Sequence, residues 1–496
     1  MTLATTARPF DAAVVGAGPN GLAAALRLQE AGMRVVLYER AAVPGGGLAT
    51  EQLTLPGFWH DTCSAIHPMA VSAPCIQRLP LHAQGLRWVE PPAAVAHPFA
   101  DRPALTLERS IDDTAQQLDH DAAAYRRFAS PFVNRWADLC ADALGPPGLP
   151  RSPWLLTRFG MQAMLPARLL ARLRFRGRAA RALFAGVAGH AVLPLDRSPS
   201  AAIGMMLQFA GHAVGWPFPE GGAAALARAM AALFVEGGGT LRCGVDITAL
   251  DAVETTGPVL FDVGPRALAR IAGDALPERF RARLQRFRYG PGLFKVDWAL
   301  RGPIPWADPQ VRRAATVHIG ETLDEIADSE AAPWRGQVSG TPYLILVQCS
   351  LFDASRAPPG QHTAWAYLHT PPGDTRDHTA LIESRIERLA PGFRDQIRAR
   401  HVLSPAALEA KNPNYVGGDV NGGAADLDQL LTRPLLAMPY RTPNPRIFLA
   451  SASTPPGGGV HGMAGDNAAR LVLRLRGHRP QWTGPEAAAG SQGPGR

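Results

Sequence analysis

Short apolar runs that end at turn residues mark the first forty residues of the chain. Residues 11–15 (DAAVV) form one such run and residues 34–38 (RVVLY) form another, and an Ala- and Leu-rich segment that stops at Gly32 separates them. Apolar runs of this length predict buried strands of a parallel sheet, and the segment between them predicts a helix. The order strand, helix, strand is typical of an α/β fold.

The same succession returns near the C-terminus. Residues 447–450 predict a strand and residues 464–475 predict a helix, with the glycine-rich turn STPPGGGVHGM between them. In the middle of the chain, residues 343–352 and 362–370 predict two strands of a second sheet, and residues 381–393 predict an amphipathic helix. The pattern therefore predicts more than one domain.

The positive charge of the chain is concentrated in one segment. The 496 residues include 50 Lys and Arg against 42 Asp and Glu, a net charge of +8. Residues 143–195 contain eight arginines and no acidic residue, so this segment carries the whole excess. A nucleic-acid-binding domain usually spreads its charge over a larger face, so we expect no nucleic-acid partner.

The length of the chain and its cysteines limit which classes of protein it can belong to. A chain this long is expected to form at least two hydrophobic cores. The five cysteines are scattered without a C-x-x-C, so we expect no disulfide framework, no metal site and a reducing, cytoplasmic compartment. No apolar run approaches ~18 residues, so no membrane-spanning helix is expected. Residues 483–496 are expected to be disordered.

The turn after the first strand carries a dinucleotide fingerprint. Gly16 permits the tight turn, Gly18 lets the backbone approach a pyrophosphate, and Gly21 lets the helix pack on the strand. The N-terminus of that helix offers free N–H groups to phosphates. Glu39 follows the second strand, where a carboxylate can accept hydrogen bonds from the ribose hydroxyls.

Two further glycine clusters favour FAD over NAD. Residues 44–48 (PGGGL) follow the second strand directly, and the C-terminal turn supplies a second helix N-terminus. That helix end can stabilise the negative charge of a reduced flavin. An NAD domain has no need of it, and no second complete fingerprint is present for a tightly bound NAD(P).

Residues 11–40, 44–58 and 453–470 together resemble the phytoene desaturase-like FAD-dependent oxidoreductases, a branch of the glutathione reductase-type flavoproteins. The resemblance extends over most of the chain. It implies an enzyme that dehydrogenates a hydrophobic, polyene- or isoprenoid-like substrate by hydride transfer to flavin N5, with oxygen or a quinone as electron acceptor.

The resemblance also implies the residues of the FAD site. The pyrophosphate and ribose are expected at the first turn, the flavin at the two other glycine clusters, and the adenine at the backbone of Ile247. The expected cofactor-binding residues are Gly16, Ala17, Gly18, Pro19, Asn20, Gly21, Glu39, Arg40, Gly46, Gly47, Leu48, Ile247, Ser453, Gly459, His461, Gly462 and Met463.

The predicted organisation is a discontinuous, Rossmann-type, three-layer FAD-binding domain with an inserted α+β substrate domain. The FAD-binding domain takes residues 1–105, 215–265 and 435–480. The substrate domain takes residues 106–214 and 266–434.

Three residues are candidates for catalysis, and each has a structural alternative. His461 either transfers a proton beside the flavin or bonds to the backbone at a tight turn. Lys295 either tunes the flavin or holds a water, or it pairs with Asp297 or another acid. Tyr415 lies in a loop that resembles one closing over the flavin, and it faces either substrate or solvent.

Two other histidines, His190 and His212, stand in apolar surroundings and are interpreted as core residues.

The arginine-rich residues 151–184 leave two interpretations open. Arg168, Arg172 and Arg176 recur every four residues, which predicts one helix with a basic and an apolar face. Such a helix either lies on an anionic membrane, as a peripheral contact at its inner face, or packs on the substrate domain with its arginines in water.

Three other functions stay open: an amine oxidase, a redox-neutral isomerase that uses FAD, and a non-catalytic lipid-binding escort protein on the same fold. Ala452 argues against the first, because amine oxidase-like relatives usually carry Glu in the corresponding stretch. The intact glycines and Glu39 argue against the last.

Overall fold

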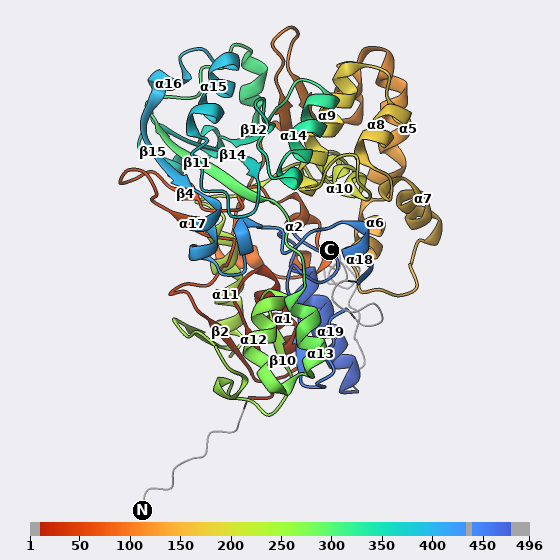
Figure 1. The fold of residues 1–496 in the computed structure, drawn as a ribbon, viewed down its shortest axis with the longest axis vertical. Helices are drawn as coiled ribbons and strands as arrows, with labels where there is room; N and C mark the ends of the chain where they lie inside the picture. The colour runs from red at the N-terminus through yellow and green to blue at the C-terminus, as the bar shows by residue number, and fades with distance from the viewer. Residues whose placement is uncertain (1–9, 433–438, 478–496) are drawn as a thin grey trace, which may run out of the picture.

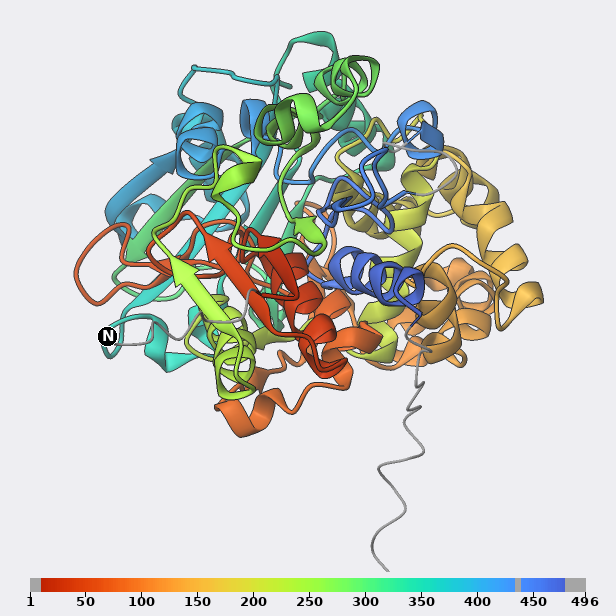
Figure 2. The same cartoon turned by 90° about the horizontal axis from the view of Figure 1, so that it is seen from below.

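The computed structural model describes residues 10–432 and 439–477. Its first sheet has five parallel strands in the order β16-β10-β1-β2-β9 (Figure 2). Distant parts of the chain meet in this sheet: β1 (Ala12–Val15), β2 (Val35–Glu39), β9 (Thr240–Cys243), β10 (Val259–Phe261) and β16 (Ile447–Leu449). A parallel sheet of this kind must be buried on both faces.

Helices cover both faces of the first sheet, in the lower half of Figure 1. Alternate residues of β1 point to opposite sides: Ala12 and Val14 pack in one core, and Ala13 and Val15 pack in the other. The first core is completed by α1 (Pro19–Glu30), α11 (Ala224–Glu236) and α19 (Met463–Leu475), and the second by α12 (Pro265–Ala272) and α13 (Glu278–Gln285). This arrangement confirms the predicted Rossmann-type three-layer α/β domain.

The second sheet has seven strands in the order β15-β11-β14-β13-β12-β6-β7. Neighbouring strands are antiparallel except for β6 and β12, which are parallel. The strands are β6 (Ala93–His97), β7 (Leu105–Leu107), β11 (Gly292–Leu300), β12 (Ala314–Ile319), β13 (Leu344–Val347), β14 (His362–Thr370) and β15 (Ile397–Leu403). One face packs on α15 (Thr379–Leu389), so its opposite face is left for the site.

A group of helices lies beside this sheet, at the upper right of Figure 1. It consists of α5 (Ala122–Val133), α6 (Trp136–Ala143), α7 (Pro153–Ala163), α8 (Ala167–Arg174), α9 (Arg178–Ala188) and α10 (Ser200–Ala213). Stacked and edge-on rings of Phe128, Phe132, Phe175 and Phe209 form the centre of this group.

The remaining elements are short connections and small helices around the two sheets. They are β3 (Thr50–Glu51), β4 (His60–Asp61), β5 (Trp88–Val89), β8 (Phe218–Pro219), α2 (Pro68–Ser72), α3 (Pro74–Gln77), α4 (Ile111–Gln116), α14 (Leu323–Ala331), α16 (Phe393–Gln396), α17 (Pro405–Lys411) and α18 (Leu427–Thr432).

The membership of the two sheets differs from the predicted domain division at two boundaries. Strand β6 belongs to the second sheet, although the boundary at 105/106 assigned it to the FAD-binding domain. Helices α12 and α13 cover the first sheet, although the boundary at 265/266 assigned them almost entirely to the substrate domain. An apolar run predicts a strand but does not say which sheet the strand joins.

Three other predicted elements differ from the structure in where they begin or end, and one predicted segment lies outside the described residues. The strand predicted at 343–352 ends at Val347, and the helix predicted at 381–393 spans 379–389. The helix expected to contain Arg168, Arg172 and Arg176 ends at Arg174, because Phe175 is extended. The tail 483–496 lies outside the described residues.

Among the described residues, no helix combines the length and apolar character needed to cross a bilayer.

Candidate functional site

One cavity of about 1230 Å³ joins the glycine-rich turns of the first sheet to the free face of the second. Most of the cofactor-binding residues expected from sequence line it: Gly16, Gly18, Pro19, Asn20, Glu39, Arg40, Gly46, Gly47, Leu48, Ile247, Ser453, Gly459 and His461. Tyr415 lines it as well. Ala17, Gly21, Gly462, Met463 and Lys295 do not, and each of these lies behind the wall.

The turn after β1 has the shape that a diphosphate requires. A Cβ at Gly21 would lie 1.9 Å from the carbonyl oxygen of Gly16, and a Cβ at Gly18 would lie 2.7 Å from Oδ2 of Asp262. Gly16 has a φ of +94°, which side chains disfavour. Helix α1 starts at Pro19, which has no N–H, and the Gly21 N–H donates to Asp262, so the Asn20 N–H is the amide of the first turn that is left for a ligand in the cavity. The turn therefore fits phosphate groups.

The carboxylate of Glu39 is held in place at the end of β2. Its Oε2 accepts a hydrogen bond from the Ala17 N–H at 2.8 Å, and its Oε1 accepts one from the Ala41 N–H at 2.8 Å. Each oxygen keeps a further lone pair. The side chain lines the cavity, so this carboxylate fits the hydroxyls of a ribose.

Asp262 is a site residue that the sequence analysis missed. It follows β10, lines the cavity, and its Oδ2 accepts a hydrogen bond from the Gly21 N–H at 2.9 Å. Burial raises the pKa of Asp262 to about 7; the Gly21 N–H opposes this shift and Glu39 adds to it. The sequence did hold a signal: a polar residue directly after the apolar run 259–261, as Glu39 follows β2.

His461 caps the last helix. Its Nδ1 accepts a hydrogen bond from the Met463 N–H at 3.0 Å, and its carbonyl oxygen lies 3.0 Å from the donating Sγ of Cys75. Burial lowers the pKa of His461 to about 4, so the ring is neutral at pH 7. Because Nδ1 accepts, the proton lies on Nε2. The backbone bond expected as an alternative is present, and the ring still lines the cavity.

Tyr415 closes the cavity over the glycines that follow β2. A Cβ at Gly47 would lie 2.7 Å from the Tyr415 hydroxyl and 4.0 Å from Sγ of Cys63. Burial raises the pKa of Tyr415 well above its usual value and also raises that of Cys63. Both groups are therefore neutral at pH 7, and Tyr415 offers a hydroxyl where a flavin is expected.

Lys295 lies behind the cavity wall rather than in it. Its ammonium pairs with Asp297 and lies 4.9 Å from the ring centroid of Trp365, and it is Trp365 that lines the cavity. Burial raises the pKa of Asp297 to about 6, although Lys295 opposes the shift. The pairing with Asp297, one of the two alternatives from sequence, is therefore present.

The far part of the cavity, here called the apolar arm, lies between the second sheet and helix α10. Trp365 and Tyr367 of β14 stack with ring centroids 5.9 Å apart, next to Ile345 and Val347 of β13. The helical side contributes Leu193, Ile203, Met206 and Leu207. Walls of this kind fit a hydrophobic molecule.

His190 is the histidine on this arm. Its Nε2 lies 2.9 Å from Nε2 of His318, so one ring donates to the other, and Nδ1 is the nitrogen left for a bound molecule. Burial lowers the pKa of His190 to about 3, so the ring is neutral. The sequence analysis interpreted His190 as a core residue, whereas the structure places it on the cavity wall; His212 does lie in the helical core, 2.7 Å from the Tyr125 hydroxyl.

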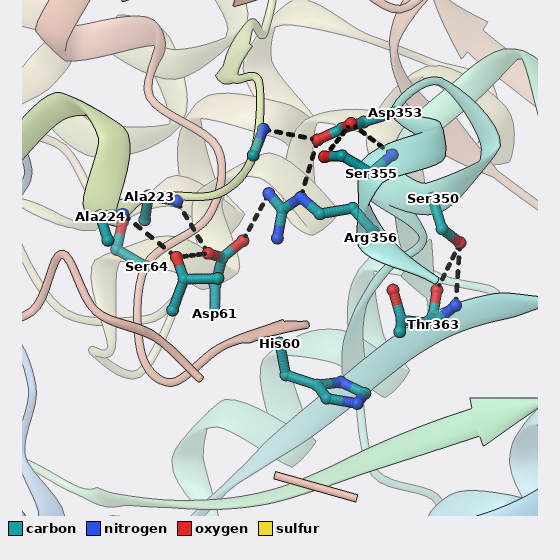
Figure 3. A network of polar contacts seen from close by, with 12 residues as sticks. His60, Asp61, Ser64, Ala223, Ala224, Ser350, Asp353, Ser355, Arg356 and Thr363 are labelled. Atoms are coloured by element: carbon teal, nitrogen blue, oxygen red, sulfur yellow. Dashed lines mark hydrogen bonds and ion pairs between the residues drawn. The ribbon is translucent and has the colours of Figure 1, made fainter. Parts of the chain in front are cut away.

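A buried ionic network fixes the wall that follows the flavin-side glycines (Figure 3). Asp61 accepts hydrogen bonds from the Thr50 hydroxyl at 2.7 Å and the Ala223 N–H at 2.8 Å, and it pairs with Arg356 at 3.0 Å. Arg356 also donates to Asp353 at 2.9 Å. Burial opposes the charge on Asp61, but Arg356 and the hydrogen bonds from Thr50 and Ala223 together outweigh it and lower the pKa of the carboxyl. The network joins residues 50–61 to the loop between β13 and β14.

Within the described ranges, no group of three or more His, Cys, Asp and Glu side chains is arranged to hold a metal ion.

Comparisons with known proteins agree with this geometry. Residues 14–79 match the model of the NAD(P)-binding Rossmann-like domain. The chain is 26% identical to pyridine nucleotide-disulfide oxidoreductase domain-containing protein 2 of Mus musculus, over 94% of this chain and 93% of that one. It is 29% identical to a phytoene dehydrogenase of Streptomyces griseus, over 80% of this chain and 79% of that one.

A solved structure of putrescine oxidase bound to putrescine is similar in fold. The TM-score is 0.58–0.59 across the forms of that enzyme, and the wild type is 15% identical and covers 94% of this chain and 99% of its own. At this identity the likeness shows the fold alone: a Rossmann-like dinucleotide-binding domain joined to a second domain, as in FAD-type amine oxidases.

Replacement of Asp262 by Asn tests the dinucleotide site. A diphosphate close to Asp262 favours the protonated carboxyl. At a pH above the pKa of Asp262, binding of FAD is therefore accompanied by uptake of one proton by this carboxylate. We expect the dissociation constant of FAD to rise about tenfold per pH unit above about 7 in the unchanged apoprotein. In D262N it stays flat over the same range, because the amide carries no charge. Flavin fluorescence titrations measure both.

The matched control is D246N, which removes an exposed carboxylate at the cavity and keeps the pH dependence. A flat profile in the unchanged protein, or the same slope in D262N, contradicts the assignment.

Removal of Arg356 tests the buried network. In R356A, Asp61 and Asp353 stay buried without their counter-ion, so we expect the free energy of unfolding to fall by about 3–5 kcal/mol. The matched R126A breaks an exposed pair with Asp112 and costs no more than about 1 kcal/mol. Urea denaturation compares the two, and equal losses would show that the network contributes no more than a surface pair.

Proposed function

We propose that this chain is an FAD-dependent oxidoreductase that dehydrogenates a C–C bond of a hydrophobic substrate. The observation that carries the proposal is the single cavity, which has a dinucleotide-binding turn at one end and the apolar arm at the other. A cofactor held at the first end reaches a substrate held at the second without crossing water. The similarity to an enzyme named phytoene dehydrogenase over most of its length supports the same class.

Each part of FAD can be assigned to residues that line the cavity. Its diphosphate fits the N-terminus of α1, its ribose fits Glu39, and its adenine fits Ile247. The ring system fits between residues 46–48 and 459–461. A bound FAD would supply a hydride acceptor, its N5 atom.

The chain itself would supply orientation, a dry surface and a proton acceptor. The apolar arm holds the substrate by burial of its hydrocarbon and keeps water away. His190 accepts a proton at Nδ1 in the tautomer in which its Nε2–H donates to His318. Burial keeps the His190 ring neutral, so Nδ1 has a free lone pair, and the lowered pKa makes this nitrogen a weaker base than that of an exposed histidine. Oxygen or a quinone is the proposed electron acceptor.

A lipophilic amine is the second candidate substrate. The stacked rings of Trp365 and Tyr367 offer faces that can hold a cation. The acidic residues on the wall lie elsewhere: Glu39, Asp246 and Asp262 stand at the dinucleotide end, and Glu51 pairs with Lys411. An ammonium group in the apolar arm would therefore depend on the two rings alone.

Anaerobic reduction distinguishes the candidates. The protein is reconstituted with FAD and mixed with squalene, as an isoprenoid hydrocarbon, or with dodecylamine. We expect the flavin absorbance to bleach with the hydrocarbon class and not with the amine. Bleaching by dodecylamine alone supports the amine oxidase. A protein that binds squalene but stays colourless and takes up no FAD is a binding protein, and that outcome contradicts the proposal.

Replacement of His190 by Gln tests the proton acceptor. We expect the rate of flavin reduction to fall about 100-fold, which is typical for the loss of a general base. The dissociation constant of FAD stays unchanged, because His190 lies on the apolar arm. The matched control is H212Q, whose histidine belongs to the same helical group but bonds to Tyr125 outside the cavity. Equal rates in H190Q and the unchanged protein rule out this role.

A further inference from the structure

Three histidines lie in line from the apolar arm into the protein interior. We call them the histidine row: His190, His318 and His97. His190 comes from the turn between α9 and α10 and lies on the cavity wall, whereas His318 of β12 and His97 of β6 are fully buried. The register of β6 and β12 pairs Val95 with Thr316, which lines the cavity, so His97 and His318 lie level with each other on the same face, two residues further on.

The far end of the row has a fixed proton. Nε2 of His97 lies 2.6 Å from the carbonyl oxygen of Gly320, and a carbonyl only accepts, so this nitrogen donates. Burial lowers the pKa of His97 to about 4, so the ring is neutral at pH 7 and has a single N–H. Its Nδ1 therefore carries a bare lone pair.

Helix α9 meets His97 and His318 at Gly186. A Cβ at Gly186 would lie 3.1 Å from Nδ1 of His97 and 3.0 Å from Nδ1 of His318. Both nitrogens are buried and have no hydrogen-bond partner in the described part of the chain. Two lone pairs repel each other, and the low dielectric constant of the interior strengthens this repulsion. The bare Nδ1 of His97 therefore favours an N–H at Nδ1 of His318.

The bond between His318 and His190 carries this preference to the cavity wall. Burial lowers the pKa of His318 well below its usual value, so this ring also has one N–H at pH 7. With that N–H at Nδ1, its Nε2 accepts, and Nε2 of His190, which lies 2.9 Å away, donates. This order of bonds leaves the lone pair of the His190 ring at Nδ1.

The glycine at position 186 keeps the two buried nitrogens open to each other. Gly186 lies in the last turn of α9, although glycine weakens a helix. Its carbonyl oxygen accepts a hydrogen bond from the Tyr343 hydroxyl at 2.6 Å, and the Tyr343 ring packs edge-on against His318 with centroids 5.8 Å apart. A methyl group at this position would press on both Nδ1 atoms.

The turn that carries His190 is held by its contacts rather than by local preference. Val192 has a φ of +52°, which a β-branched side chain avoids. The His190 ring is fixed by the bond to His318 and by the Trp216 ring, which meets it edge-on with centroids 5.4 Å apart. Strained residues of this kind concentrate at functional sites.

We propose that Gly320, His97 and His318 set the tautomer of His190, so that its bare Nδ1 faces the apolar arm. His97 and His318 are positioning residues, and only His190 would touch substrate. The use of Nδ1 as the proton acceptor rests on the proposed function. There, one C–H bond of the substrate gives a hydride to FAD, the neighbouring C–H bond gives its proton to Nδ1, and the electron pair of that second bond becomes the C=C bond. The imidazolium still donates from Nε2 to His318, which keeps it oriented.

Nitrogen-15 NMR of the full-length, FAD-reconstituted protein tests the tautomers directly. The protein is labelled at the ring nitrogens of histidine, and long-range proton–nitrogen correlations distinguish an N–H from a bare nitrogen. Spectra of H190Q, H318Q and H97F assign the signals. We expect a bare Nδ1 in His190 and His97 and a bare Nε2 in His318.

Two variants interrupt the histidine row in different ways. G186A places a methyl group beside both Nδ1 atoms, and H97F keeps a ring without nitrogens. In each we expect His190 to become a mixture of two tautomers. The rate of flavin reduction then falls by the same factor as the population with a bare Nδ1, about twofold if the tautomers become equal. The dissociation constant of FAD stays unchanged.

Two matched variants serve as controls. G160A adds a methyl group at a helix glycine that has nothing within 4 Å of the new atom, and H212F removes a buried histidine that bonds to Tyr125 outside the cavity. Both leave the His190 tautomer as in the unchanged protein. Circular dichroism shows that each variant is folded.

Three results overturn the proposal: an N–H at Nδ1 of His190 in the unchanged protein, an unaltered His190 tautomer in either G186A or H97F, or an equal change in the controls. The spectra are recorded without substrate, so they do not depend on turnover. A flavin that no hydrocarbon bleaches contradicts the proposed function and leaves the tautomer assignment standing.

Discussion

The close approach of helix α1 to the ends of β1 and β10 is the constraint on which the site depends. The start of α1 lies so near the Gly16 carbonyl and the Asp262 side chain that Gly18 and Gly21 have no room for a Cβ. Because Gly18 and Gly21 carry no side chains, the start of α1 lies at the cavity wall with Asp262 beside it. The strand order β10-β1-β2 then brings Asp262 and Glu39 to the same edge of the sheet. An anion site therefore stands beside two carboxyl groups, one of which has a raised pKa.

A buried ionic network connects the second sheet to this site. Residues 50–61 leave the flavin-side glycines and are held by Arg356, which comes from the loop between β13 and β14. Arg356 is only 2% exposed, so its three-way contact with Asp61 and Asp353 must offset a large desolvation cost. The register of β14 then presents Trp365 and Tyr367 to the same cavity.

Local motifs could be predicted from sequence, whereas contacts between distant strands could not. The turn at Gly16 and the cap at His461 depend on residues within a few positions of each other, and the structure has both. Lys295 was a reasonable candidate, but the alternation and register of β11 place it behind Trp365. His190 depends on His318, 128 positions away. Helical periodicity predicted a helix with a basic face but could not predict that Arg168 and Arg172 of α8 both pair with Asp324, more than 150 positions away.

A crystal structure of the protein with FAD tests the central claim most directly, because that claim is geometric: one cavity holds the dinucleotide at one end and the substrate at the other. The account predicts the diphosphate at the N-terminus of α1 and the ring system between residues 46–48 and 459–461, with its reactive face toward Trp365, Tyr367 and the apolar arm. A dinucleotide bound elsewhere, or a ring system turned to solvent with the apolar arm closed off from it, would contradict the account.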